Sequence, residues 1–172
     1  KRALYSEIIP ILVKYLNTAT MDLVDQRASM LSVSVYFCPS IAGVLLDAVS
    51  PNSAVPLSMD LGGNYSLLSQ IRYLKYLKSI VMSMNMQENE ISKLTPIIES
   101  VSQYVTHPLE DIRHRIGDFI SSVVISAFLN HSANGNVRSS PKFPSFLRSL
   151  YSFFVTIQNC EPIDENDMEA CN

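Results

Sequence analysis

Apolar residues recur at intervals of three and four along most of the chain, and this helical period constrains the fold more than any other feature. The predicted helices cover residues 3–17, 22–37, 40–49, 65–84, 90–105, 109–129 and 143–158. Runs of β-branched residues at 31–35 and 123–125 lie inside longer segments of helical period, so they do not indicate strands. We therefore expect an all-α fold.

The first two predicted helices each carry an apolar stripe that we expect to be buried. In residues 3–17 the stripe comprises Leu4, Ile8, Ile11, Leu12 and Tyr15. In residues 22–37 it comprises Leu23, Met30, Leu31 and Val35. Pro39, two residues after this segment, is expected to end the second helix.

Segments without a helical period divide the rest of the chain. Residues 50–64 hold two prolines, two glycines and other turn formers, which predicts a loop insertion, and residues 130–141 form a second loop. The tail, 161–172, is acidic and polar, so we expect it to be disordered. Residues 1–160 are thus predicted to form the helical part. Because the first predicted helix starts beside Lys1 and no methionine precedes it, we expect the chain to be part of a longer protein.

Composition narrows the class of partner. The 172 residues are 47% hydrophobic and 17% charged with a net charge of −3, so nothing electrostatic favours nucleic acid or an anionic membrane. The most apolar stretches, 31–46 and 119–129, are interrupted or too short to span a bilayer. Cys38, Cys160 and Cys171 share no CxxC spacing, which favours reduced thiols in the cytoplasm or nucleus and offers no zinc site.

Two stretches of the sequence share a pattern of proline, acid and arginine. One begins at Pro10 and the other at Pro96, an offset of 86 residues, or twice 43. Each has an Asp-x-Arg fifteen to seventeen residues after its proline, namely Asp25-x-Arg27 and Asp111-x-Arg113. A period near 43 is typical of helical-pair repeats of the HEAT and armadillo type. The chain resembles a HEAT repeat array.

The same offset matches apolar positions, with Ile11 and Leu12 opposite Ile97 and Ile98, and Met30 opposite Ile116. The charges at 107–115 are then interpreted as the start of a repeat's second helix, where an acid is favoured by the helix dipole. The Asp-x-Arg side chains are expected to be structural and to pair with the neighbouring repeat. Gly117 is expected to let a facing helix approach closely.

One segment carries a more specific resemblance. "HPLEDIRHRIGDFISSVV" (107–124), with its continuation at 139–154, is similar to part of the large single-chain HEAT-repeat proteasome activators; the matching residues are His107, Pro108, Arg113, Arg115, Ile116 and Gly117. The resemblance implies an all-α, HEAT-like α-solenoid of about three to four antiparallel helix pairs. It also implies a section of a non-catalytic cap on the 20S proteasome core particle, cytoplasmic and nuclear, linked to degradation of acetylated histones and to DNA repair. The family opens the gate through a C-terminal tail that this chain's Ala170-Cys171-Asn172 does not match, so gate opening is not assigned.

The candidate chemical sites in the sequence each have a simpler structural interpretation. His107, Asp111 and His114 are spaced i, i+4 and i+7, but Pro108 takes His107 out of the helix, so we expect no metal site. Gly62-Gly63 lies in no phosphate-binding motif. We expect no cofactor and no catalytic residue.

Residues 72–78 offer one candidate for a partner-binding face. Arg72, Lys75 and Lys78 run along one helix, interleaved with Tyr73 and Tyr76. Such a stripe is more often the solvated face of an amphipathic helix, although the tyrosines could anchor an interface.

The alternatives to a proteasome activator are a karyopherin-type nuclear transport receptor, a scaffold subunit of a larger complex, and an all-helical enzyme.

Overall fold

The computed structural model describes residues 2–50, 66–129 and 137–160, with side chains for residues 7–50, 66–128 and 137–160. These residues form seven α-helices and no strand, which confirms the all-helical prediction. The helices are α1 (Arg2–Asn17), α2 (Val24–Phe37), α3 (Ser40–Val49), α4 (Leu67–Ser83), α5 (Glu88–Ser102), α6 (Glu110–Val124) and α7 (Phe143–Asn159). A 3-10 turn, η1 (Met21–Leu23), precedes α2, and a π-helical turn, η2 (Ile125–Leu129), follows α6. Of the loops predicted at 50–64 and 130–141, residues 51–64 and 130–136 lie outside the described residues, as does the predicted tail at 161–172.

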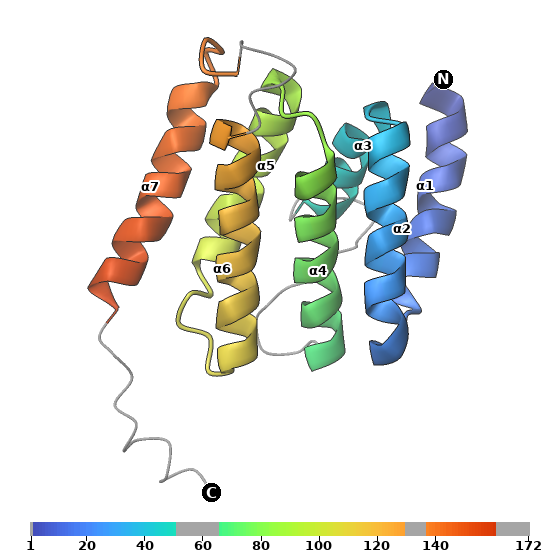
Figure 1. The fold of residues 1–172 in the computed structure, drawn as a ribbon, viewed down its shortest axis with the longest axis horizontal. Helices are drawn as coiled ribbons and strands as arrows, with labels where there is room; N and C mark the ends of the chain where they lie inside the picture. The colour runs from blue at the N-terminus through green and yellow to red at the C-terminus, as the bar shows by residue number, and fades with distance from the viewer. Residues whose placement is uncertain (1, 51–65, 130–136, 161–172) are drawn as a thin grey trace, which may run out of the picture.

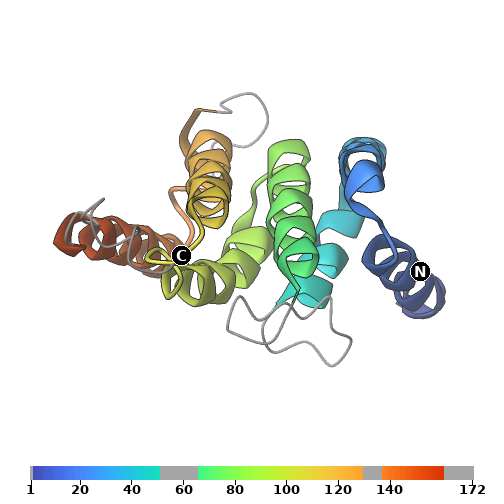
Figure 2. The same ribbon diagram turned by 90° about the horizontal axis from the view of Figure 1, so that it is seen from below.

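The helices form two layers. An even layer consists of α2, α4 and α6, side by side, and an odd layer consists of α1, α3, α5 and α7 (Figures 1 and 2). Within the layers α4 packs against both α2 and α6, and α5 packs against both α3 and α7. The colour gradient of Figure 1 shows that even helices run in one direction and odd helices in the other. Consecutive helices are therefore antiparallel and alternate between the layers.

Local sequence signals determine where several helices begin. Pro39 separates α2 from α3, and the Ser66 side chain accepts a hydrogen bond from the backbone N–H of Ser69 at 3.3 Å, which caps α4. Pro10 and Pro96 each lie at the ninth residue of an odd helix, α1 and α5, where each removes one backbone hydrogen bond. The two prolines therefore have the same position when counted from the start of each helix.

Three even helices bury the same pattern of side chains. Counted along α2, α4 and α6, the matching buried sets are Val24, Tyr73 and Ile112; Ala28, Leu77 and Ile116; Leu31, Ile80 and Phe119; and Val35, Met84 and Val123. The spacing is 49 residues from α2 to α4 and 39 from α4 to α6. The pattern therefore repeats in three dimensions although its spacing in sequence is uneven.

The odd layer repeats in the same way. The side chains that α5 buries, Ile91, Leu94, Ile98 and Val101, are each followed 52 residues later by a buried side chain of α7, namely Phe143, Phe146, Leu150 and Phe153. Along the odd layer, α7 packs against α5 and α5 packs against α3.

The 86-residue offset does not match these buried positions. Met30 is 50% exposed whereas its counterpart Ile116 is 1% exposed, and Ile11 is 71% exposed whereas Ile97 is fully buried. The matching offsets are 85 residues between α1 and α5, as from Ile9 to Leu94, and 88 between α2 and α6. The residue pairing inferred from the 86-residue offset is therefore wrong. The two offsets differ, so α1 and α2 are not spaced along the sequence in the same way as α5 and α6.

The predicted buried stripe of α1 is also wrong. Ile8, Ile11 and Tyr15 are exposed, and only Leu12 of the described stripe packs partly buried against the core. The buried side chains of the helix are Ile9, Val13 and Leu16. The Leu4 side chain lies outside the described residues. Both sets of residues have a helical period, so the period alone does not show which set faces the other helices.

Candidate protein-interaction surfaces

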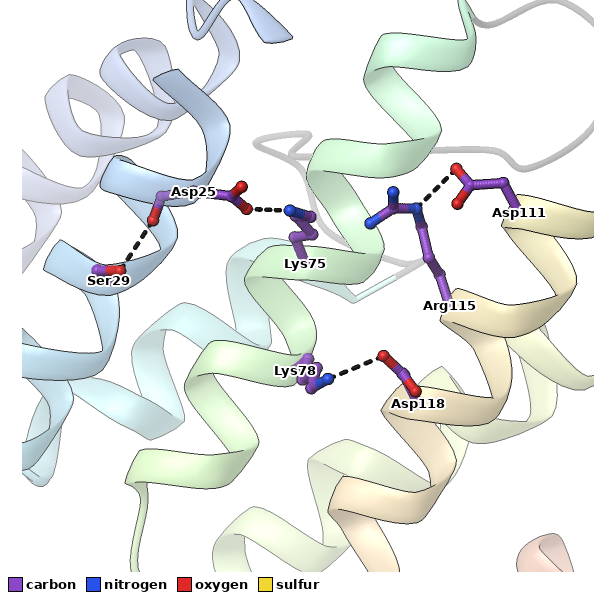
Figure 3. Close-up of polar contacts among 7 residues, drawn as sticks. All are labelled: Asp25, Ser29, Lys75, Lys78, Asp111, Arg115 and Asp118. Atoms are coloured by element: carbon purple, nitrogen blue, oxygen red, sulfur yellow. Dashed lines mark hydrogen bonds and ion pairs between the residues drawn. The ribbon is translucent and has the colours of Figure 1, made fainter. Parts of the chain in front are cut away.

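Ion pairs connect the three helices of the even layer. Lys75 of α4 pairs with Asp25 of α2, and three residues along the same helix Lys78 pairs with Asp118 of α6 at 2.8 Å (Figure 3). Asp111 bonds Arg115 within α6 at 2.9 Å. The expectation that the Asp-x-Arg acids pair with a neighbouring helix therefore holds for Asp25 and is wrong for Asp111. These partly exposed pairs each contribute about 0–1 kcal/mol.

The two Asp-x-Arg arginines bond to backbone carbonyls. Arg27 donates to the carbonyl of Tyr15 and, at 3.0 Å, to the Thr18 hydroxyl, which lie at the end of α1. Arg113 donates to the carbonyls of His107 and Pro108 at 2.7 and 2.9 Å, in the connection from α5 to α6. Each arginine thus satisfies carbonyls where an odd helix leads into an even one.

The candidate partner-binding residues of α4 make contacts within the fold. Tyr76 is fully buried and its hydroxyl donates to the Leu16 carbonyl at 2.9 Å; Tyr73 is also buried and donates to the Val49 carbonyl at 3.2 Å. Burial raises the pKa of both phenols. The two rings lie in the core because they continue the buried pattern of the even layer. This corrects the expectation that these tyrosines face a partner.

The cations of the same stretch are likewise used inside the molecule. Arg72 donates its Nε to the Ala19 carbonyl at 2.7 Å, and Lys75 and Lys78 form the ion pairs of the even layer. Their partners come from helices on both sides of α4. The three cations of residues 72–78 therefore hold neighbouring parts of the fold together.

The histidines at the start of α6 act locally. His107 accepts a hydrogen bond from the backbone N–H of Leu109 through Nδ1 at 3.1 Å, and His114 lies 3.6 Å from a carboxylate oxygen of Glu110. Among the described residues, no group of three or more His, Cys, Asp or Glu side chains could hold a metal ion.

Gly117 lies on an open side of α6. A Cβ built there meets no atom within 4 Å, so the expected close approach of a facing helix is not present among the described residues. At Gly43 of α3, in contrast, a Cβ would meet Nδ2 of Asn89 at 2.9 Å. The close approach thus occurs at a glycine that the sequence pattern did not single out.

Three of the described helices each expose several large apolar side chains. They are Ile8, Ile11 and Tyr15 on α1; Met30, Val33, Tyr36 and Phe37 on α2; and Leu147, Tyr151, Phe154 and Ile157 on α7. Helices α1 and α7 form the two edges of the odd layer (Figure 2). The sequence contains these residues at helical spacing, but only the arrangement of helices distinguishes them from the buried stripes.

No described helix combines the length and the apolar character needed to cross a membrane. Comparisons with protein-family models, curated proteins and solved structures found no match to this chain.

Proposed function

We propose that the chain is a HEAT-like α-solenoid section that serves as a non-catalytic protein-interaction scaffold, and specifically as part of an activator that caps the 20S proteasome core particle. Three antiparallel helix pairs, α1/α2, α3/α4 and α5/α6, with α7 as the first helix of a fourth, fit this reading. The single observation that supports it best is the repeated buried pattern of the even layer, which continues over three parallel helices.

The edges of the odd layer support an interaction role. Solenoids that end in solvent need terminal repeats with a polar outer face. Here α1 exposes Ile11 and α7 exposes Tyr151, at 71% and 70%, so each edge helix carries large apolar side chains on its exposed side. Exposed clusters of large apolar residues are typical of surfaces that contact other proteins.

The assignment to the proteasome rests on the resemblance of residues 107–124 alone. Native gel electrophoresis or mass photometry of the purified chain with purified 20S core particles tests it. We expect a discrete complex. Absence of a complex at micromolar concentrations would reject the activator proposal.

Three variants identify the surface used. Ile11→Ser, Phe37→Ser and Tyr151→Ser each remove one exposed ring or chain from α1, α2 or α7 without touching the core. At least one should reduce binding to the core particle about tenfold or more, as interface anchors do, while all three keep the helical circular dichroism of the parent. Binding equal to the parent in all three would contradict a role for these exposed surfaces.

Affinity capture with the same purified chain distinguishes the activator from a karyopherin-type receptor. Affinity capture from cell extract that recovers transport cargo and a small GTPase, without 20S subunits, would favour a karyopherin-type receptor and overturn the activator proposal.

A further inference from the structure

The outer face of α1 presents an ordered apolar stripe. Ile8, Ile11 and Tyr15 are spaced by three and four residues, so they share one side of the helix, and all three are exposed. Figures 1 and 2 both show α1 at one edge of the molecule. The stripe is therefore accessible along its length in the described part of the chain.

The aromatic end of the stripe is held in place. The Arg27 guanidinium lies 4.1 Å from the centre of the Tyr15 ring, and the Tyr15 hydroxyl contacts the sulfur of Met30 at 3.6 Å. Met30 is itself half exposed and extends the apolar surface from α1 onto α2. A ring that is already fixed loses little conformational freedom when a partner covers it.

Two opposite charges flank the stripe on one side. Glu7 and Lys14 are both exposed and lie seven residues apart, which is nearly two helical turns, so they share one edge of α1. Within the described part of the chain, neither takes part in an ion pair. Their midpoint lies beside Ile11.

The exposed face of α1 is complementary to the same face of a second copy when the two helices run antiparallel. In an antiparallel pair of α1 helices centred near Ile11, Glu7 of each copy lies opposite Lys14 of the other, and the apolar stripes face each other. In a parallel two-fold pair, the flank that carries Glu7 and Lys14 would lie on opposite sides of the contact in the two copies, so neither charge would meet its opposite. We propose that the chain forms a two-fold symmetric dimer through antiparallel α1 helices, with Ile11 at its centre and two Glu7–Lys14 ion pairs at its flanks.

The exposed stripe of α7 lacks this property. Arg148 is the one charged residue in the sequence of α7, so a second copy of α7 would bring no opposite charge to it. The charge pattern therefore favours α1 over α7 as the surface that binds a second copy. This inference does not depend on binding to the core particle.

Sedimentation velocity and light scattering after size-exclusion chromatography measure the association, under reducing conditions because Cys38 is an exposed cysteine. A contact built on one helix is small, so we expect a weak dimer whose mass rises from 19.2 kDa toward twice that value between about 1 and 500 µM. A mass that stays at that of one chain over this range would overturn the proposal.

Two point variants with matched exposure test the location. Ile11→Asp places an uncompensated charge at the proposed centre and should weaken the dimer by more than about tenfold. Tyr151→Asp, at a residue equally exposed on α7, should leave the mass distribution unchanged. The reverse result, with association lost only in Tyr151→Asp, would assign the interface to α7 and reject α1.

Charge reversal tests the antiparallel register. Glu7→Lys and Lys14→Glu each create two like-charge contacts and should each weaken the dimer about three- to tenfold. The double variant, and an equimolar mixture of the two single variants, should restore association because each reversed charge again meets its opposite. Failure of both the double variant and the mixture to restore it would exclude the proposed pairing.

Discussion

Replacing Tyr76 with phenylalanine tests whether this tyrosine is a core residue rather than a partner contact. The substitution keeps the fully buried ring and removes the hydroxyl that donates to the Leu16 carbonyl at 2.9 Å. That hydrogen bond joins α4 to the end of α1, across 60 residues of sequence. We expect a loss of stability without any change in helix content.

The expected magnitude follows from what happens to the Leu16 carbonyl. A lost intramolecular hydrogen bond costs about 0.5–1.5 kcal/mol, and a buried group left without a partner costs about 1–3 kcal/mol. The Leu16 carbonyl still accepts from the backbone N–H of Ala19, at 3.3 Å, in the variant. Because that longer bond relieves part of the penalty, we expect a decrease of about 1–2 kcal/mol in the free energy of unfolding.

Urea unfolding followed by circular dichroism measures this decrease. The midpoint should fall while the slope m stays constant, since the surface exposed on unfolding is unchanged. In a domain of this size the melting temperature should fall by roughly 2–8 °C. Tyr151→Phe removes a hydroxyl from an exposed ring and should change the free energy of unfolding by less than about 0.5 kcal/mol.

Two results would refute this reasoning. Stability of Tyr76→Phe within about 0.5 kcal/mol of the parent would mean that the hydrogen bond to the Leu16 carbonyl contributes little. Loss of partner binding at unchanged stability would return Tyr76 to the partner-binding face.

Three further outcomes are expected. Burial raises the pKa of the Tyr73 and Tyr76 phenols, so the folded protein keeps these two protons to a higher pH than the unfolded chain does. The free energy of unfolding is therefore unaffected by these phenols below the unfolded-state pKa of about 10. As the pH rises above that value, the free energy of unfolding should fall by up to about 1.4 kcal/mol per pH unit for each phenol. Urea titrations at pH 8 and pH 11 can measure this fall, and Tyr73→Phe should reduce it. Arg113→Ala removes two hydrogen bonds to carbonyls and should lower the free energy of unfolding by about 1 kcal/mol, with partner binding unchanged; loss of binding at full stability would assign Arg113 to a binding surface. Gly117→Ala should raise the free energy of unfolding by about 0.5–1 kcal/mol because the site is helical and open, and a decrease measured by urea unfolding would reveal a close neighbour at that glycine.

Helix existence could be predicted from the sequence because it depends on local periodicity. The segment expected at 65–84 is α4, Leu67–Ser83, and the segment expected at 90–105 is α5, Glu88–Ser102. The segment expected at 109–129 is α6 followed by the π-helical turn, since the backbone pattern changes at Ile125. Pro39 ended one helix and began the next, as its missing N–H and fixed φ require.

The partners of the charged residues could not be predicted in the same way. Lys75 and Lys78 are three residues apart in one helix, yet they pair with acids 50 residues before and 40 residues after them. Which neighbour each lysine faces depends on how far α4 is rotated about its own axis, and whether it meets an acid there depends on the rotation of α2 and α6. A rotation of one residue, about 100°, moves a side chain from one neighbour to another or into solvent.

The same sensitivity explains why a repeat can be detected in sequence and still be aligned wrongly. The 86-residue offset lies between the 85 residues that separate equivalent positions of α1 and α5 and the 88 that separate those of α2 and α6. An error of two residues in the even layer rotates the helix by about 200° and exchanges its buried and exposed faces. That exchange placed exposed Met30 opposite buried Ile116. The acid and the arginine mark the starts of α2 and α6, and a helix start can vary by a few residues. Burial instead follows the angle about the helix axis, which therefore has to be taken from contacts between helices.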